Sequence, residues 1–413
     1  MSRGRLWVLV VASIGLAACS DAPTMGRRYA LLADTDSSDW SAVTTGFDHT
    51  CALKRDGQAF CWGSNKYGQL GVSQTDSTCT IGGKPYGCSA VPLPVQTRIR
   101  FSMLSAGGHH TCGVTATGQA YCWGADGDGQ LGEYGPDGPS FVQVVSVLGW
   151  SQIAAGDAHT CALRVDGLVV CWGKNIEGQL GAGFASASYS PVRARMPLPA
   201  TFLSAGSERT CALVSDGTVY CWGGLWLSRD AAGDEVTRTQ TTPVTVPDAP
   251  ALAGLSVGGL GTCGFDVTGF GYCWEGNPHG ESGNGTIVGS ITPQRIASTV
   301  QLVRISDGGA QACGIAVGGA AYCWGDDSYG QLGSGSSHVA ERCTQAELPC
   351  STQPVPVFGA QQFTAISTSL GGHTCGVTTR GNLYCWGNGS LGQLGNGTRR
   401  VSQSIPIKVA ASR

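Results

Sequence analysis

Fourteen of the 19 cysteines form seven pairs whose members lie ten residues apart. Cysteine sulfurs can join as disulfides or bind a metal as thiolates. Zinc sites usually use ligands about two to four residues apart, and each pair here offers only two sulfurs. We therefore predict disulfides and not metal sites. The pairs are Cys51 with Cys61, Cys112 with Cys122, Cys161 with Cys171, Cys211 with Cys221, Cys263 with Cys273, Cys313 with Cys323, and Cys375 with Cys385.

A glycine stands six positions after the first cysteine of every pair, for example Gly57 in "CALKRDGQAFC". A three-residue hairpin loop needs a left-handed residue at its third position, which glycine adopts without steric cost. With the loop at residues 55–57, Lys54 pairs with Gln58 and Cys51 faces Cys61. Facing residues of a non-hydrogen-bonded pair are about 4.5 Å apart at Cα, within reach of a disulfide. Each repeat is therefore predicted to hold a β-hairpin with a disulfide between its strands.

The first cysteines of successive pairs lie 49 to 62 residues apart, a period typical of stacked supersecondary units. A tryptophan follows the second cysteine of every pair, as Trp62 follows Cys61. Because side chains alternate along a strand, the tryptophan and the disulfide lie on opposite faces, and both faces of the hairpin are apolar. Such a sheet must pack between neighbouring sheets. The abundant glycine and the 42% hydrophobic content agree with one turn-rich β domain over residues 39–413.

Two repeats carry long insertions after a "GQLG" segment. These lie between Gly71 and Pro94 and between Gly333 and Pro354, and each contains two further cysteines. We predict local disulfides joining Cys79 with Cys88 and Cys343 with Cys350. A bridged loop loses little entropy on binding, so both insertions are candidate binding loops, and drift in loop length is the alternative. The candidate contact residues are Lys84, Tyr86, Glu341, Arg342 and Leu348.

Four of the seven histidines occupy one repeat position, two residues before the first cysteine of a pair: His49, His110, His159 and His373. A ring of imidazoles near a common axis could bind a metal. The other three repeats have Arg209, Gly261 and Gln311 at this position. We therefore expect a structural role, in which each histidine bonds to the backbone of its own repeat, and we predict neither a metal site nor a cofactor. Whether the four histidines have a further role is left open.

The sequence contains no recognisable constellation of catalytic residues. The aspartates that precede the hairpin glycines, Asp56, Asp166 and Asp216, are ordinary turn residues and are replaced in other repeats. We recognise no Ser-His-Asp arrangement, no pair of catalytic carboxylates and no phosphate-binding loop. The sequence therefore predicts no catalytic role.

Residues 1–19 resemble a bacterial lipoprotein signal. Two arginines precede an apolar run of 13 residues, Leu6–Ala18, which is too short to span a bilayer as a helix. In such signals the peptidase cleaves before a cysteine that carries lipid, here Cys19. We predict a signal peptide over 1–18 and a lipidated N-terminus with a flexible tether over 19–38. The chain would be exported and held at the cell envelope by lipid alone, on the outer membrane if the cell has two membranes; an ordinary signal peptide is the alternative.

The charge of the chain argues against a nucleic-acid partner. Without residues 1–18 the chain has 23 basic and 28 acidic side chains. It has no cluster of lysines or arginines, on which nucleic-acid binding depends. Export also suits the many cysteines, because disulfides persist outside the reducing cytosol.

The repeated pattern, seen in "SAGGHHTCGVTATGQAYCWGADGDGQLG" (105–132), resembles the regulator of chromosome condensation repeat. The resemblance covers residues 39–413 and implies an all-β fold, a seven-bladed β-propeller of four-stranded antiparallel blades with the disulfides inside the blades. We expect the terminal strands to pair and close the ring. Repeat four lacks "GQLG", repeat five has Glu275 in place of a glycine, and repeat seven has Leu370 in place of another. We therefore expect blades four and five to be irregular.

In a ring of seven, repeats one and six flank repeat seven, so both insertions should rise from the same sector of one face. Nucleotide exchange on a nuclear GTPase and chromatin binding, the role of the founding family, do not suit an exported acidic chain, because a fold does not carry function. We predict a monomeric, non-catalytic scaffold that binds an unidentified protein at the cell envelope. The alternatives are an inhibitor, a propeller that binds a carbohydrate or a metal, and an extracellular enzyme.

Overall fold

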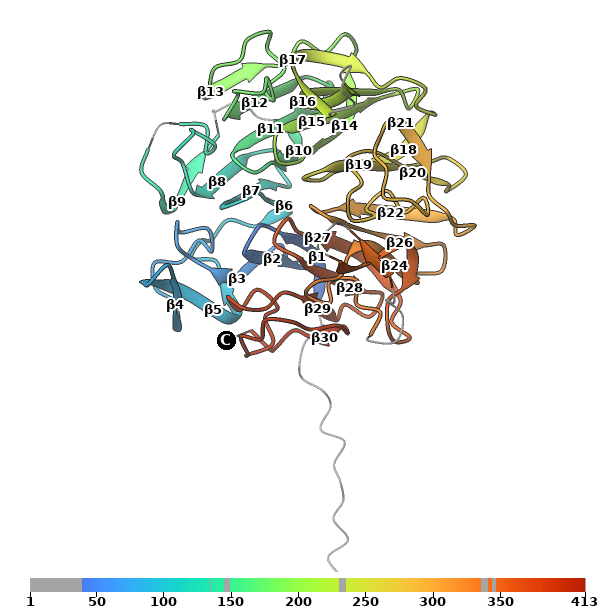
Figure 1. Cartoon of the computed structure of the whole chain (residues 1–413). Helices are drawn as coiled ribbons and strands as arrows, with labels where there is room; N and C mark the ends of the chain where they lie inside the picture. Colours follow the sequence, from blue (N-terminus) through green and yellow to red (C-terminus); the bar gives the residue numbers. More distant parts are fainter. Residues whose placement is uncertain are drawn as a thin grey trace, which may run out of the picture. The chain divides into compact units, whose positions relative to one another are not determined.

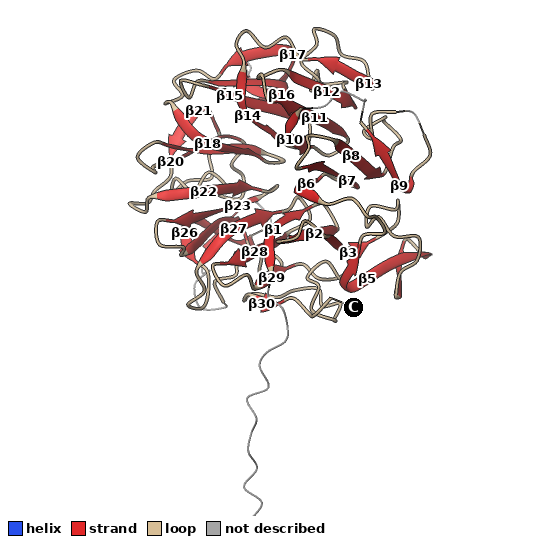
Figure 2. Cartoon of the chain, turned by 180° about the vertical axis from the view of Figure 1, so that it is seen from behind, coloured by secondary structure: helices blue, strands red, loops and turns tan. Residues whose placement is uncertain are grey.

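Seven antiparallel sheets, each built from consecutive strands, surround a common centre (Figure 1). The computed structural model describes residues 39–133, 135–144, 149–229, 235–335, 341–343 and 347–412. All regular elements in these residues are strands (Figure 2). None of the described residues forms a helix long and apolar enough to cross a membrane. The predicted seven-bladed, all-β propeller is confirmed.

The first four blades begin with the strand nearest the centre and run outward. Blade 1 holds β1 (Trp40–Thr45), β2 (His49–Lys54), β3 (Ala59–Ser64), β5 (Lys84–Pro94) and β4 (Ser77–Ile81). Blade 2 holds β6 (Phe101–Ala106), β7 (His110–Thr115), β8 (Ala120–Gly124) and β9 (Gly138–Gln143). Blade 3 holds β10 (Trp150–Ala155), β11 (His159–Arg164), β12 (Val169–Gly173) and β13 (Ser188–Arg193). Blade 4 holds β14 (Ala200–Ala205), β15 (Arg209–Val214), β16 (Val219–Arg229) and β17 (Glu235–Thr245).

The last three blades follow the same order. Blade 5 holds β18 (Leu252–Val257), β19 (Gly261–Asp266), β20 (Gly271–Glu275) and β21 (Ser290–Arg295). Blade 6 holds β22 (Leu302–Asp307), β23 (Gln311–Ala316), β24 (Ala321–Asp326), β26 (Leu348–Pro356) and β25 (Glu341–Cys343). Blade 7 holds β27 (Phe363–Thr368), β28 (His373–Thr378), β29 (Leu383–Gly387) and β30 (Ile407–Lys408).

The second and third strands of each blade form the predicted hairpin. In blade 1 the Lys54 N–H donates to the Gln58 carbonyl at 2.9 Å, and Gly57 has φ 80°. Cys51 lies opposite Cys61 in the register. All seven facing cysteine pairs are joined as disulfides, with Cα atoms 4.0–4.1 Å apart. The turn chemistry of the glycine therefore sets a register that brings the two sulfurs together.

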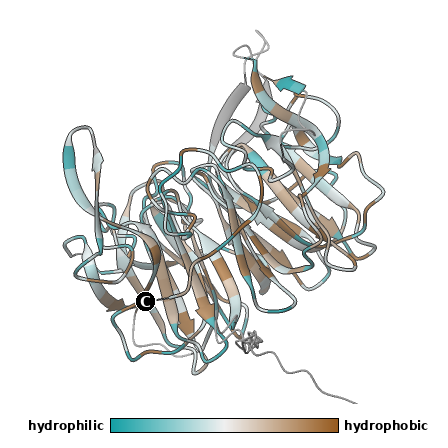
Figure 3. Ribbon diagram, turned by 90° about the horizontal axis from the view of Figure 1, so that it is seen from below, coloured by the Kyte–Doolittle hydropathy of each residue, from teal (hydrophilic) through white to brown (hydrophobic). Residues whose placement is uncertain are grey.

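The apolar core is divided among the seven contacts between successive blades, which we call seams and name by their blade numbers. In each seam the disulfide of one blade packs with the tryptophan of the next: the disulfide of Cys51 and Cys61 with Trp123 in seam 1/2, for example. The same pairing recurs in the other six seams. Figure 3 shows the blades edge-on, with hydrophobic residues along the strands and many hydrophilic residues in the loops. Both faces of every hairpin are thus covered, as the alternation of side chains predicts.

The expected pairing of the terminal strands is wrong. β1 pairs with β2 and β30 pairs with β29, so each blade is made entirely from its own repeat. Blades 7 and 1 are instead joined by side chains and by single backbone bonds, such as the Trp40 N–H to the Gly381 carbonyl at 3.1 Å, as the other blades are. Ser367 Oγ accepts the Thr45 N–H at 3.1 Å, and Trp62 Nε1 donates to the Gln393 carbonyl at 2.9 Å.

The irregular repeats change the blades locally. In blade 4, β16 and β17 are 11 residues each and form a long hairpin where other blades have the "GQLG" loop. In blade 5, Glu275 keeps the left-handed conformation of the glycine it replaces, with φ 80°. In blade 7, Thr368 pairs with Thr374, whereas Thr45 pairs with Thr50 in blade 1, so the loop before β28 is one residue longer. Leu370 lies in that longer loop.

Candidate functional site

Both insertions lie at the same face of the propeller, which we call the insertion face. Because the strands of a blade are antiparallel, the loop after the first strand and the loop after the third strand meet at the same end of the blade. The insertion face therefore carries the "GQLG" loops, the hairpins β4–β5 and β25–β26, and the short loops that hold Phe47 and His109. The turns of the disulfide-bridged hairpins lie at the opposite face.

The β4–β5 hairpin is fastened at its base. Cys79 and Cys88 form the predicted disulfide. Arg399 of blade 7 donates to the Thr78 carbonyl at 2.8 Å and lies against both sulfurs. Lys84 is exposed near the tip, as a contact residue would be.

Tyr86 of the same hairpin does not point freely into solvent. It is half-buried, and its hydroxyl is buried. Burial and the nearby Asp48 carboxylate raise the pKa of Tyr86, while Ser64 and Lys66 oppose that rise. Tyr86 thus faces the body of blade 1 and offers a partner only part of its ring.

The strands of the β25–β26 hairpin are shorter than those of the first hairpin. Cys343 and Cys350 form the predicted disulfide. Glu341 accepts the Thr352 N–H at 2.7 Å, and Arg342 donates to the Glu341 carbonyl at 2.9 Å. Glu341 also lies beside the two sulfurs, but a disulfide supplies no thiolate for a metal. Leu348 keeps 37% of its surface exposed.

The two hairpins share a face but do not lie side by side. β5 and β26 stand on opposite sides of blade 7 in Figures 1 and 2. The loop of blade 7 that precedes β30 contacts the first hairpin through Arg399, whereas the second hairpin runs beside the blade 5 loop at Gly280. The two insertions thus flank blade 7 at one face, as the order of the repeats predicts, and each leans toward the blade that precedes its own.

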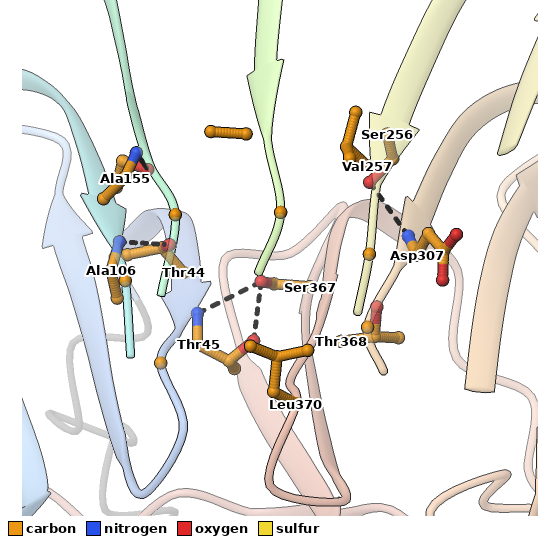
Figure 4. Close-up of a pocket in the computed structure, with 18 of the residues that line it drawn as sticks. Thr44, Thr45, Ala106, Ala155, Ser256, Val257, Asp307, Ser367, Thr368 and Leu370 are labelled. Atoms are coloured by element: carbon orange, nitrogen blue, oxygen red, sulfur yellow. Dashed lines mark hydrogen bonds between the residues drawn. The ribbon is translucent and has the colours of Figure 1, made fainter. Parts of the chain in front are cut away.

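A cavity of about 170 Å³ lies at the centre, lined by the innermost strands and the loops that follow them. Six of the seven innermost strands place a serine or threonine hydroxyl against the next blade, where it accepts a backbone N–H, as Figure 4 shows for Thr44, Ser256 and Ser367. The other three hydroxyls that accept in this way belong to Ser105, Ser204 and Ser306. Ala154 of blade 3 has no hydroxyl. These hydroxyls fasten the blades around the channel, a role not predicted from the sequence although a serine or threonine recurs at this position in six repeats.

The repeated histidines fasten one blade to the next. His49 Nε2 lies 2.9 Å from Thr111 Oγ1 of blade 2, and that hydroxyl donates to the Gln69 carbonyl of blade 1 at 3.0 Å. Trp123 Nε1 donates to the same carbonyl at 3.0 Å. Because the threonine proton goes to the carbonyl, the imidazole must donate through Nε2. We call this four-residue arrangement of His49, Thr111, Gln69 and Trp123 the clasp.

The clasp recurs in three further seams. The histidines His110, His159 and His373 lie 2.8–2.9 Å from the hydroxyls of Thr160, Thr210 and Thr50 of the next blade. Those hydroxyls donate to the carbonyls of Gln130, Gln179 and Gln393. The expectation that each histidine bonds to its own backbone is therefore wrong. Each imidazole bonds to a different threonine, and the four do not meet at one point.

The clasp histidines are neutral. All four are fully buried, and burial lowers the pKa of His49 to about 4 and the pKa values of His110, His159 and His373 to about 3. A neutral imidazole with a proton on Nε2 suits the donor role in the clasp.

Seam 4/5 replaces the clasp with charges. Arg209 stands at the histidine position of blade 4, only 2% exposed, and its Nη1 lies 2.7 Å from Glu275 Oε2. Its Nη2 donates to the Gly259 carbonyl at 2.9 Å, and Thr262 Oγ1 donates to Glu275 at 2.9 Å. Glu275 occupies the glycine position after the tryptophan, opposite Gly261. Arg209 and Glu275, the two departures noted in the sequence, therefore belong together. They form a buried ion pair that replaces the clasp in seam 4/5.

The insertion-face mouth of the cavity carries a group of polar and aromatic side chains. His109 stacks near Phe47 and Tyr67, with ring centroids 5.8 Å and 5.0 Å away, and its Nδ1 lies 3.5 Å from Asp48 Oδ1. Burial opposes the charge of both groups, but their mutual attraction outweighs it, so the pKa of Asp48 is lowered and that of His109 is raised. Leu370 reaches the cavity from blade 7. Phe47, Asp48 and His109 occur once each at their repeat positions, so the repeated pattern in the sequence gives no signal for them.

Cys19, the residue predicted to carry lipid, and residues 1–38 as a whole lie outside the described residues. The eighteen other cysteines form nine disulfides, all within single blades. So many disulfides are typical of an oxidising environment outside the cytosol.

Family models of the regulator of chromosome condensation (RCC1) repeat match residues 40–69, 104–130, 150–179, 201–224 and 363–393, and in a second form residues 56–114 and 380–413. The chain is 32% identical over 116 residues to the ultraviolet-B receptor UVR8 of Arabidopsis thaliana and 37% identical over 90 residues to the probable E3 ubiquitin-protein ligase HERC4 of Homo sapiens. These matches cover 26% and 22% of this chain, and 23% and 8% of the two relatives. The chain thus spans less than a quarter of the length of either relative.

Solved structures share the fold, among them the following two. Prp20p from Saccharomyces cerevisiae, described with its binding properties to Gsp1p and histones, has a TM-score of 0.73 at 18% identity over 87% of each chain. Human WBSCR16 has a TM-score of 0.68 at 19% identity, over 80% of this chain and 84% of that one. At such identities the likeness shows the fold alone. Repeat motifs and blade architecture agree: the chain carries RCC1 repeats that fold as a seven-bladed β-propeller.

Proposed function

We propose that the protein is an exported, lipid-anchored propeller that binds a protein partner through its insertion face and has no catalytic role. The observation that carries the proposal is the constraint on the two insertions. Each hairpin is closed by a disulfide, and β4–β5 is also fastened to blade 7 by Arg399. A surface that is already ordered loses little conformational entropy when a partner binds.

Exposed side chains on the insertion face have the chemistry of a protein interface. Phe47 is 47% exposed at the mouth of the cavity, and Leu348 is 37% exposed on the second hairpin. Lys84 and Arg342 add positive charge at the two hairpins, on a chain that is acidic overall. Apolar anchors surrounded by polar side chains are the usual core of a binding surface. The binding of Gsp1p by Prp20p supports the idea that a propeller of this fold can act in this way.

The proposal for the N-terminus depends on the sequence. A lipid at Cys19 would hold the propeller at a membrane without a spanning helix, since acyl chains partition at about 0.8 kcal/mol per buried CH₂. The tether over 19–38 would let the insertion face reach partners in the envelope.

Interface variants test the proposal. The full chain, purified in detergent, is immobilised and exposed to solubilised envelope proteins, and the retained proteins are compared among variants. Leu348→Ala combined with Lys84→Glu should reduce the retention of a specific partner at least tenfold. The matched control is Val317→Ala combined with Arg98→Glu, because Val317 is 66% exposed and Arg98 is exposed, both near the opposite face. Equal retention by both double variants, or no specific partner for the wild type, would refute binding through the insertion face.

A further inference from the structure

Seam 5/6 has lost both side chains of the clasp. Gly261 stands where blade 5 would carry its histidine, and Ala312 stands where blade 6 would carry its threonine. The tryptophan contact is kept, because Trp324 Nε1 donates to the Glu281 carbonyl at 2.8 Å. The seam therefore keeps the shape of a regular seam and lacks the polar side chains that normally fill it.

The carboxyl group of Asp307 occupies the place of the missing imidazole. A methyl group built on Gly46 would meet the Cε1 atom of His49 at 2.2 Å, and one built on the equivalent Gly258 would meet Oδ1 of Asp307 at 2.4 Å. Asp307 belongs to blade 6 and lies at the end of β22. Its N–H donates to Ser256 Oγ at 2.9 Å (Figure 4). The acid thus enters the same space from the opposite blade.

Asp307 has no hydrogen-bond partner for its carboxylate among the described residues. The residue is only 6% exposed, and neither Oδ1 nor Oδ2 is bonded. Burying an ionised carboxylate without a partner is costly, so such groups either stay protonated or bind a cation. Burial raises the pKa of Asp307 well above its usual value; the Arg209 charge lowers it, and Glu281 and Glu275 raise it further.

Oxygen atoms surround the space beside Gly261. A methyl group on Gly261 would lie 3.3 Å from the Trp274 carbonyl oxygen, 3.4 Å from Asp307 Oδ2 and 3.7 Å from the Gly276 carbonyl oxygen. Two more buried acids lie nearby: Glu275, paired with Arg209, and Glu281, 3.9 Å from His279. Carboxylate and carbonyl oxygens are the ligands that Ca²⁺ prefers, with water completing its shell. Asp307 also lines the central cavity, which offers a path from solvent.

The geometry points to a Ca²⁺ site in the wall of the central channel, with Asp307 as its carboxylate ligand and the Trp274 and Gly276 carbonyls beside it. One carboxylate with backbone and water ligands gives a weak site, and a dissociation constant on the order of 0.1–1 mM is expected, as in extracellular calcium modules. This inference is independent of the proposed partner and goes beyond it.

Equilibrium dialysis with radioactive Ca²⁺ tests the site on the purified full chain. One ion should bind per molecule, and Asp307→Asn should weaken binding at least tenfold. Gly261→Ala should also weaken it, because its methyl group enters the space between the three oxygens, at 3.3 Å or more from each of them. Asp216→Asn, which changes an exposed acid in a hairpin turn of blade 4, should bind as the wild type does. Unfolding monitored in CaCl₂ and in NaCl of equal ionic strength should show a calcium-dependent rise of about 1–3 °C that Asp307→Asn lacks.

Three results would overturn the inference. The first is a wild type that binds no Ca²⁺ up to 10 mM, about ten times the weakest expected dissociation constant. The second is unchanged binding by Asp307→Asn. The third is an Asp307→Asn variant more stable than the wild type under all conditions, with no calcium effect on either, which would mean that the carboxyl group simply holds a proton.

Discussion

The four seams that carry a clasp and the charged seams on either side of blade 5 solve the same packing problem with different chemistry. A clasp uses a neutral imidazole and a hydroxyl, as between His49 and Thr111. Seam 4/5 uses a buried guanidinium and a carboxylate, Arg209 and Glu275, and seam 5/6 uses an acid alone, Asp307. The shared disulfide and tryptophan show that apolar packing sets the geometry of a seam. The polar side chains of a seam can then differ, from a clasp to an ion pair to a single acid.

Acid should distinguish the two kinds of seam most strongly. The pKa of each clasp histidine is lowered from 6.5 to about 3 or 4, so below pH 6.5 the unfolded chain binds protons that the folded chain does not. Stability is therefore complete above pH 6.5 and falls by about 1.4 kcal/mol per pH unit for each histidine as the pH decreases toward those values. Urea unfolding at pH 7, 6 and 5 measures the slope.

Histidine variants that copy the residue found in blade 6 provide the control for that slope. Gln311 stands at the same position and donates to the Ser369 carbonyl at 3.0 Å without titrating. Changing all four histidines to glutamine should flatten the stability curve between pH 6.5 and 5. His109, whose pKa is raised, remains in both proteins and cancels in the difference. A slope that the substitutions leave unaltered would show that the clasp histidines are not the acid-sensitive groups.

Breaking the ion pair of seam 4/5 should have the next largest effect. Arg209→Met leaves Glu275 buried with its charge uncompensated, which should cost about 3–5 kcal/mol in the free energy of unfolding. Adding Glu275→Gly should restore much of that loss, because a glycine suits the left-handed backbone at this position, φ 80°. Lys174→Met, in the more exposed pair of Lys174 with Glu208, should cost no more than about 1 kcal/mol. Chemical denaturation of the wild type, the two single variants and the double variant measures each free energy of unfolding. A double variant as unstable as Arg209→Met would argue against the pairing of Arg209 with Glu275.

Removing one hydroxyl from a clasp should have the smallest effect. Thr111→Val leaves His49 Nε2 and one lone pair of the Gln69 carbonyl without a partner, for an expected loss of about 1–3 kcal/mol. Thr374→Val is the matched control, because Thr374 bonds to the Gln331 carbonyl at 3.0 Å and no histidine of the described residues bonds to it. The difference between the two losses gives the contribution of the imidazole. Equal losses would mean that the histidine contributes nothing to the seam.

The local structure of this protein is predictable because its signals are local. The spacing of Cys51, Gly57 and Cys61 fixes a hairpin and its register within eleven residues, and the structure confirms it seven times. The tryptophan after the second cysteine likewise predicts that both faces of the blade are covered. Turn chemistry and strand alternation act over a few residues, so a single sequence contains them in full.

The chemistry of the seams was not predictable because it joins residues of different repeats. His49 and Thr111 lie 62 positions apart, and nothing in the spacing shows which hydroxyl meets which imidazole. Asp307 cannot be recognised as a candidate ligand from the sequence, because its neighbours there are ordinary. It becomes one only in the structure, where Gly261 and Ala312 replace the histidine and threonine of a clasp. Leu370 was compared with the wrong residues, because its loop is one residue longer than those of other blades.

Each blade takes all its strands from its own repeat, and the contact between the last blade and the first has the same chemistry as the other clasped seams. His373 reaches Thr50 at 2.9 Å just as His110 reaches Thr160. The seam between the last and the first blade is therefore equivalent to the other clasped seams. A gene cut between any two repeats and rejoined through its original ends would encode seven intact blades, so the chain ends could be moved around the circle without dividing a sheet.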